Sequence, residues 1–225
     1  MTQMVEPRSA VPPAPGPGPA PLPVADPAPL GLAAFALTTF VLSVHNVGWA
    51  PDIIWVGLAL FYGGLVQLLA GMQEFKNRNV FGATAFSTYG GFWLSLGIYV
   101  VLIFAVPALL KGAAGSTGNG IDDGVGWFLL AFAIFNTYML FWSTRVSKAV
   151  FLVFLTLEIT EIILFIGGFQ HQGPVPPATT GFTWVNLGGL LGILTALTAW
   201  YASAAGVVNG QAGRVILPTG APFWK

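Results

Sequence analysis

The sequence contains no cysteine and only two histidines, His45 and His171, among its 225 residues. The absence of cysteine excludes disulfide bonds, thiolate metal ligands and cysteine nucleophiles. The two histidines are too far apart in the chain to form a His-x₃-His pair, so we expect no metal centre. No other residue pattern indicates a bound cofactor.

Charged residues are also scarce, at 7% of the chain against 55% hydrophobic residues. A soluble domain carries about 25% charged residues, so these side chains are too few to cover a water-exposed surface. Most of the chain is therefore expected to have lipid as its solvent. The formal net charge is zero and the basic residues are scattered, which argues against nucleic-acid binding.

Residues 1–29 differ from the rest of the chain. Ten of the 17 prolines lie between Pro7 and Pro29, interleaved with alanine and glycine. Such a segment favours extended polyproline conformations and buries no core. It also lacks the basic start and apolar stretch of a signal peptide. We expect residues 1–29 to form a disordered cytoplasmic tail, followed by a membrane domain over 30–208 and a short cytoplasmic tail over 209–225.

The membrane domain is divided into apolar blocks by short polar loops. A membrane span needs about 20 apolar residues, and six blocks approach or exceed that length. They cover residues 30–48, 53–73, 82–108, 125–142, 149–169 and 183–207. The alternating pattern of a β-barrel strand is absent. The sequence thus predicts an all-α, polytopic membrane protein with six transmembrane helices.

The charges in the loops predict the orientation of these helices. Six spans place both termini on one side of the membrane. Seven of the eight basic residues fall on that side: Arg8, Lys76, Arg78, Arg145, Lys148, Arg214 and Lys225. Only Lys111 falls on the other side. Because positive charge concentrates in cytoplasmic loops, both termini are expected to be cytoplasmic.

Two carboxylic acids, Glu158 and Glu161, lie about halfway along the fifth predicted helix. A charged residue at this depth costs about 2.5–3.5 kcal/mol on insertion scales. Their spacing of three places them on neighbouring parts of one helix face, which must be turned away from lipid. Two interpretations have equal weight: a site that binds and releases protons, or a structural hydrogen bond to another helix or subunit.

The first and second helices carry further polar candidates. Thr38, Thr39 and Asn46 lie on one face of the first helix together with Phe35. In the second helix, Gln67 is a mid-span amide that needs a partner or a ligand. His45, near the outer end of the first helix, is either a titratable group at the pore mouth or, as we favour, a hydrogen-bonded structural residue.

The start of the first helix has the sequence DPAPLGLAAF, from Asp26 to Phe35. It resembles the N-P-[AV]-P-L-G-L-x-x-F signature of the acetate uptake transporter family, the succinate–acetate permeases. The resemblance continues at HNVG (45–48), FYGG (61–64), FGATAF (81–86), YGGFW (89–93) and GRVILP (213–218). Asp26 departs from the signature, which has asparagine there. Its added negative charge argues against a simple anion-attracting role, although a helix start is otherwise suited to an anion.

The resemblance implies six helices around a narrow pore in each protomer, with protomers assembled as a homo-hexamer. We expect the protein in the cell membrane, either a plasma membrane or a bacterial cytoplasmic membrane. It implies transport of acetate, and of succinate in some members, by proton symport or by channel-like conduction. The narrowest point in the family is formed by a phenylalanine, a tyrosine and a leucine, which correspond here to Phe35, Tyr89 and Leu157. Asp26, Thr38, Thr39, Asn46 and Gln67 are predicted along the path, and Glu158 and Glu161 are the candidates for proton coupling.

Two other functions compete with transport. A receptor or sensor of small carboxylates would need a cytoplasmic output domain, and the chain offers only the proline-rich tail. An intramembrane enzyme would need a nucleophile with its base, or metal ligands, at membrane depth, and the sequence shows neither. We therefore expect a transporter and not an enzyme.

Overall fold

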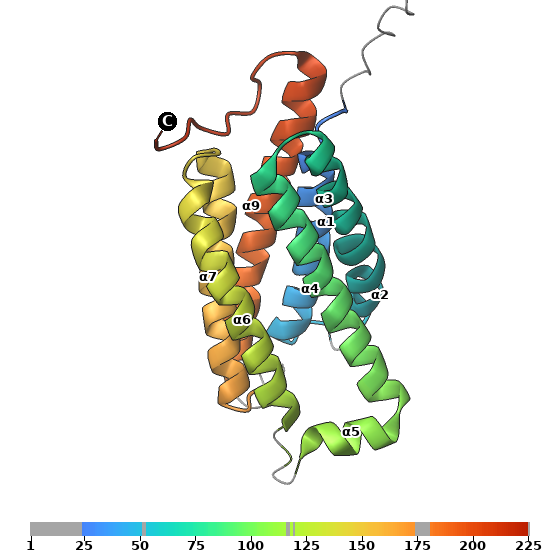
Figure 1. Ribbon diagram of the computed structural model, residues 1–225. Helices are drawn as coiled ribbons and strands as arrows, with labels where there is room; N and C mark the ends of the chain where they lie inside the picture. Colours follow the sequence, from blue (N-terminus) through green and yellow to red (C-terminus); the bar gives the residue numbers. More distant parts are fainter. Residues whose placement is uncertain (1–23, 51–52, 116–117, 119, 174–180, 225) are drawn as a thin grey trace, which may run out of the picture.

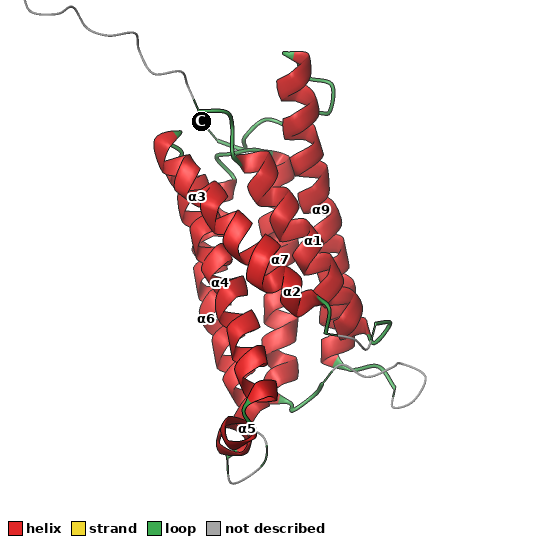
Figure 2. Ribbon diagram, turned by 90° about the vertical axis from the view of Figure 1, so that its right-hand side faces the viewer, coloured by secondary structure: helices red, strands yellow, loops and turns green. Residues whose placement is uncertain are grey.

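The computed structural model describes residues 24–50, 53–115, 118, 120–173 and 181–224. Within them, six helical segments are long and apolar enough to cross a membrane: Ala28–Val47, Trp55–Lys76, Val80–Ala105, Gly120–Ser143, Lys148–Phe169 and Trp184–Ala212. Figure 2 shows helices and loops, and no β-strand occurs in this described part of the chain. The predicted all-α fold with six spanning helices is confirmed.

The spans form an elongated bundle, with the start of α1 and the C-terminal segment near one pole (Figure 1). Helix α1 (Ala28–Val47) packs on α9 (Trp184–Ala212), and α9 packs on α7 (Lys148–Phe169). Helix α7 also packs on α6 (Gly120–Ser143). Helix α4 (Val80–Ala105) packs on the second span and also contacts α6. The spans therefore surround a central axis.

The second span is interrupted in the middle. It runs through α2 (Trp55–Leu60), a π-helical turn η1 (Phe61–Val66) and α3 (Gln67–Lys76). A single π-turn inside an α-helix shifts the register of the side chains that follow it, and such turns are frequent at functional sites. The turn is rich in small residues: Gly63 lies against Thr38 of α1, and Gly64 lies against the Ala59 carbonyl of its own helix.

Helix ends follow local signals in the sequence. The side chain of Asn79 accepts a hydrogen bond from the Gly82 amide at the start of α4, and Ser147 does the same for Val150 at the start of α7. A side-chain oxygen at this position satisfies an amide that has no partner in the first helical turn. These polar residues therefore fix the short connections between spans.

The third predicted span ends earlier than expected. Helix α4 stops at Ala105, Val106 is extended, and a separate short helix, α5 (Pro107–Ala114), begins at the proline. A residue that precedes proline is driven out of the helical region by steric contact with the proline ring, which explains the break. Helix α5 then lies at the pole opposite the C-terminus (Figure 1).

Helices α1 and α9 approach each other to backbone contact. A Cβ atom at Gly189 would lie 2.7 Å from both the Ser43 carbonyl oxygen and the Val47 amide nitrogen of α1. Small residues let membrane helices approach to backbone contact, where van der Waals packing replaces the hydrophobic effect that lipid removes.

The last residues of the chain lie across one end of the bundle. The predicted boundary at residue 208 falls inside α9, which continues to Ala212. The segment after it is bound to the end of α6 and the start of α7: Ala149 donates to the Thr219 carbonyl, and Phe223 donates to the Thr144 carbonyl, both at 2.9 Å. Residues 1–23 of the predicted N-terminal tail lie outside the described residues.

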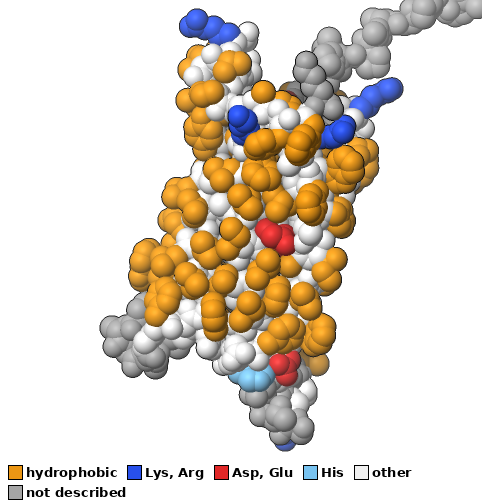
Figure 3. All heavy atoms as spheres, turned by 90° about the vertical axis from the view of Figure 1, so that its left-hand side faces the viewer, with side chains coloured by type: hydrophobic (Ala, Val, Ile, Leu, Met, Phe, Trp, Pro, Cys, Tyr) orange, Lys and Arg blue, Asp and Glu red, His pale blue; other side chains and the backbone are white. Residues whose placement is uncertain are grey.

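The outer surface of the bundle is apolar. Large side chains such as Phe61, Phe104 and Phe141 are about 70% exposed on it. Figure 3 shows hydrophobic side chains over most of one face, with lysine and arginine gathered toward one end. This distribution is typical of a protein surface that faces the hydrocarbon of a membrane.

Candidate functional site

The three residues predicted to form the narrowest point, Phe35, Tyr89 and Leu157, come together in the structure. They lie on α1, α4 and α7, are each less than 8% exposed, and line one cavity of about 20 Å³. That volume holds about one water molecule and excludes a larger solute. The remaining lining residues are Leu32, Gln67, Ala85, Phe86, Val153 and Phe154. The cavity is thus a narrow, mostly apolar point between four helices, with Gln67 contributed by α3 (Gln67–Lys76).

The ring of Tyr89 is enclosed by other aromatic rings. Its centroid lies 5.8 Å from that of Phe35 and 5.6 Å from that of Phe135, both edge to face. Phe92 and Phe132 lie 6.1 Å away. These arrangements match the preferred geometry of aromatic pairs, each of which contributes about 0.5–1.5 kcal/mol beyond its buried area.

The hydroxyl group of Tyr89 is hydrogen-bonded to α6 and α7. It lies 2.9 Å from the side-chain carbonyl oxygen of Asn136 and 3.3 Å from Oε1 of Glu161. Asn136 is completely buried, and Glu161 is only 3% exposed. The polar end of the constriction tyrosine is therefore held by two buried side chains.

The second carboxylic acid, Glu158, lies at the edge of the same network. It accepts hydrogen bonds from Nδ2 of Asn136 and from the hydroxyl of Thr137, each at 2.7 Å. Unlike Glu161, it is partly exposed, and Thr137 lies on the outer surface of the bundle. Figure 3 shows acidic atoms midway along an otherwise apolar face. The two glutamates predicted on one helix face therefore differ in environment, one buried and one reaching the outer surface.

Asn136 is a site residue that the sequence analysis missed. It links Tyr89 to Glu158 and also donates to the Phe154 carbonyl at 3.0 Å. The signal was available, because an amide in the middle of an apolar span needs a hydrogen-bonding partner. The same argument that predicts a partner or a ligand for Gln67 holds for Asn136 in the fourth predicted helix, residues 125–142.

Gln67 lines the cavity from the first residue after the π-turn. It is 1% exposed, and its side-chain oxygen has no hydrogen-bonding partner among the described residues. Leaving a buried polar atom without a partner costs about 1–3 kcal/mol, so a water molecule or a solute in the cavity would stabilise it. Gln67 is thus placed to bind whatever enters the narrow point.

A wider cavity of about 220 Å³ lies toward the α5 end of the bundle. Its lining includes two predicted residues, His45 and Asn46, together with Asp122 and Gln172. The Nδ1 atom of His45 lies 3.0 Å from the Ala50 carbonyl, the kind of structural contact that we favoured for it. This volume is close to the lower end of the range for pockets that bind small molecules.

The other predicted path residues lie near the helix start and within α1. Asp26 is exposed and accepts a hydrogen bond from the Ala28 amide at 3.0 Å. Thr38 is completely buried against Gly63 and donates to the Ala34 carbonyl. The hydroxyl of Thr39 is buried and has no partner in the described part of the chain.

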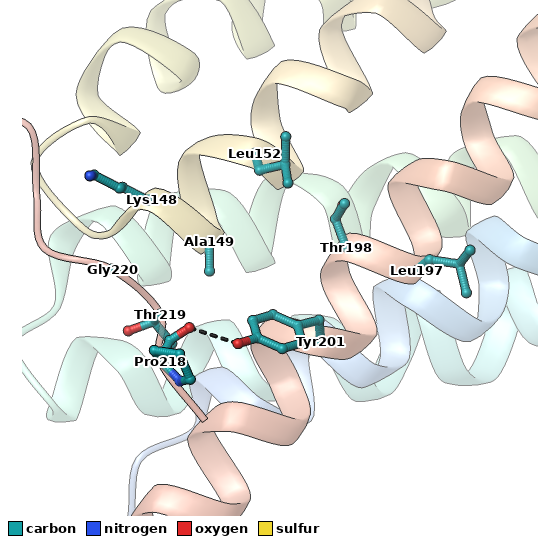
Figure 4. Close-up of a pocket in the computed structure, with 9 residues that line it drawn as sticks. All are labelled: Lys148, Ala149, Leu152, Leu197, Thr198, Tyr201, Pro218, Thr219 and Gly220. Atoms are coloured by element: carbon teal, nitrogen blue, oxygen red, sulfur yellow. Dashed lines mark hydrogen bonds between the residues drawn. The ribbon is translucent and has the colours of Figure 1, made fainter. Parts of the chain in front are cut away.

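A larger cavity of about 510 Å³ lies away from the constriction, between the C-terminal segment, the start of α7 and the middle of α9. Figure 4 shows Tyr201 reaching toward this segment, and its hydroxyl donates to the Pro218 carbonyl at 2.7 Å. The cavity contains none of the predicted site residues. We therefore place the candidate site at the constriction.

Comparison with known proteins identifies similar chains over nearly the whole sequence. The profile of the GPR1/FUN34/yaaH family matches residues 13–222. Acetate permease A of Emericella nidulans is 42% identical over 213 residues, which cover 89% of this chain and 67% of that protein. The Succinate-acetate/proton symporter SatP of Escherichia coli K12 is 34% identical over 197 residues, covering 87% and 95%.

A solved structure, described as that of the bacterial acetate channel SatP, is also similar. The TM-score is 0.73 at 34% sequence identity, and the match covers 88% of this chain and 99% of that one. The shared fold extends over all six spans and not over a fragment. With the six apolar helices, it identifies the chain as a multi-pass membrane protein.

Proposed function

The chain belongs to the GPR1/FUN34/yaaH family, and from that premise we propose that it carries acetate and related small carboxylates, such as succinate, across a membrane. The observation that carries the proposal is the meeting of Phe35, Tyr89 and Leu157 around a cavity of one-water size. Relatives over nearly the whole chain are named as an acetate permease and a succinate-acetate/proton symporter.

The cavity explains why a small carboxylic acid would be selected. Three apolar side chains strip water from a solute, which is costly for a hydrated ion. The Gln67 amide supplies a polar contact for a carboxyl group, while the aromatic rings contact a methyl group. Acetate is larger than one water molecule, so the three side chains must move apart to let it pass, and they must move further for an acid with a longer carbon chain.

Proton movement with the substrate is part of the proposal. A bare carboxylate at the constriction would meet apolar rings and the two glutamates of α7 without a positive partner. Burying an unpaired charge costs several kcal/mol, so a proton would accompany the acid on its way through. The relative named a proton symporter supports this coupling, and the relative structure named a channel supports conduction through a continuous path.

We place the protein in the plasma membrane as a homo-hexamer, with both termini in the cytoplasm. The basic residues of the described chain support the orientation: Lys76, Arg78, Arg145, Lys148 and Arg214 follow or precede spans at one end. Lys111 lies on α5 at the other end. The names of the relatives favour transport over a receptor function or an enzymatic one.

The experiment is uptake of labelled acetate by the purified chain in proteoliposomes, with and without an imposed pH gradient. Uptake above that of empty vesicles supports transport. Accumulation above equilibrium that requires the gradient, and that a protonophore abolishes, supports symport. Equilibration that is indifferent to the gradient supports channel-like conduction. Acetate entry no faster than in empty vesicles would contradict the proposed function.

A further inference from the structure

The position of Tyr89 depends on a hydrogen bond to Asn136 whose direction is fixed. Both hydrogens of the Asn136 amide are used, one by the Phe154 carbonyl at 3.0 Å and one by Oε2 of Glu158 at 2.7 Å. Its carbonyl oxygen therefore faces Tyr89, and at 2.9 Å it accepts the phenolic hydrogen.

The hydrogen count then determines the state of Glu161. A phenol has one hydrogen, and Asn136 takes it. Oε1 of Glu161 lies 3.3 Å from the same phenolic oxygen, so the phenol can share its hydrogen with this atom only weakly, and a full second hydrogen bond requires Glu161 as the donor. A neutral, protonated Glu161 satisfies the arrangement. A charged Glu161 would face the lone pairs of the phenol or would take its hydrogen and leave the buried Asn136 oxygen without a donor.

Among the described residues, no positive charge acts on Glu161 to hold a carboxylate. The ionisable groups that act on it are Glu158 of α7 and Tyr89 of α4. Helix α6 contributes the neutral Asn136 and also Tyr138, which acts on Tyr89. On α9, the hydroxyl of Thr195 is bonded to Thr160. Losing the proton from Glu161 would thus leave a buried negative charge with no compensating cation in the described part of the chain.

We propose that the proton on Glu161 controls the constriction through Tyr89, with Asn136 as the positioning residue. With the proton bound, Glu161 and Asn136 hold the phenol, and its ring narrows the path beside Phe35. When the proton leaves to water, the carboxylate competes with Asn136 for the phenolic hydrogen, and Tyr89 gives up its position. This regulation rests on the proposed function, because it acts on the same path.

The test compares acetate flux of variants with that of the unaltered protein at each pH, with equal pH on both sides. The ratio of variant flux to unaltered flux at the same pH cancels the effect of pH on the ionisation of acetate. In Glu161→Gln the amide donates to Tyr89 at every pH, whereas in the unaltered protein this bond depends on pH. The flux ratio should therefore change with pH by about fivefold or more, which is the lower range of coupling between two sites. Tyr89→Phe keeps the ring, removes the bond and should lose the same pH response.

Two comparisons make the result specific. Tyr99→Phe, a phenol on the same helix outside the network, should keep the pH response of the unaltered protein. The double variant Glu161→Gln with Tyr89→Phe should respond to pH no differently from either single variant, because both remove one coupled interaction. A flux ratio that is constant over pH, or additive effects in the double variant, would overturn the proposal.

Infrared spectroscopy provides a readout that does not depend on transport. The carbonyl stretch of a protonated carboxyl group should be present in the unaltered protein, absent in Glu161→Gln and shifted in Tyr89→Phe. If this band is unaffected by both substitutions, Glu161 does not carry the proton. If the spectra agree but the unaltered protein carries no acetate, the proposed function fails while the hydrogen-bonded switch stands.

Discussion

The rings of Phe35 on α1 and Tyr89 on α4 meet edge to face, with centroids 5.8 Å apart and planes inclined by 64°. The two residues are 54 positions apart in the chain, and each is at most 5% exposed. Their contact crosses the central axis of the bundle, where Leu157 of α7 completes the lining of the small cavity. These three side chains therefore line the small cavity that we propose as the narrowest point of the path.

Removing either ring should widen the path. In Phe35→Ala or Tyr89→Ala, flux of a larger acid such as lactate or succinate should rise relative to acetate by about tenfold, the scale at which an apolar site discriminates by one methylene. Competitive uptake of two labelled acids measures the ratio. Phe104→Ala is the matched control, because Phe104 lies on α4 but is 69% exposed on the outer surface. An unchanged ratio in both ring variants would place the constriction elsewhere.

The orientation can be tested with single cysteines, since the chain contains none. Replacing exposed Arg78 or Arg214 should give a thiol that a membrane-impermeant reagent labels only after the cytoplasmic side is opened. Replacing Lys111 of α5 should give one that is labelled in intact cells. Labelling at position 78 from outside would refute the arrangement with both termini in the cytoplasm.

The close approach of α1 and α9 predicts a local loss of stability. Gly189→Ala would push a methyl group to 2.7 Å from backbone atoms of Ser43 and Val47, so the helices must separate. Overpacking of this kind costs about 1–3 kcal/mol, and thermal unfolding in detergent should begin at a lower temperature. Gly210→Ala on the same helix has open space around it and should unfold like the unaltered protein.

The architecture was largely predictable because the bilayer imposes a simple rule on sequence. Each span must be apolar for about 20 residues, so composition alone located all six helices. Two features that this rule on apolar length does not describe were not predicted. The short helix α5 depends on the steric effect of Pro107 on Val106, and the π-turn before Gln67 depends on packing of glycines against neighbouring helices.

The site was predictable in part. Phe35, Tyr89 and Leu157 were predicted from the family resemblance, and in the structure they lie around one cavity. The sequence also located Glu158 and Glu161, but helical spacing alone did not show that one is buried and the other reaches the outer surface. The sequence marks Asn136 as a mid-span amide that needs a partner, but which groups it joins is visible only where α4, α6 and α7 meet.

The most direct test of the central claim is acetate flux through Leu157→Cys before and after reaction with a small water-soluble thiol reagent. The chain has no other cysteine, so the reagent acts at one position. Leu157 lines the cavity, and the added group should block acetate flux, with acetate itself slowing the reaction. Ile159→Cys, two residues along α7 and 42% exposed, should carry acetate equally before and after treatment. Complete modification of position 157 with undiminished acetate flux would contradict a transport path between Phe35, Tyr89 and Leu157.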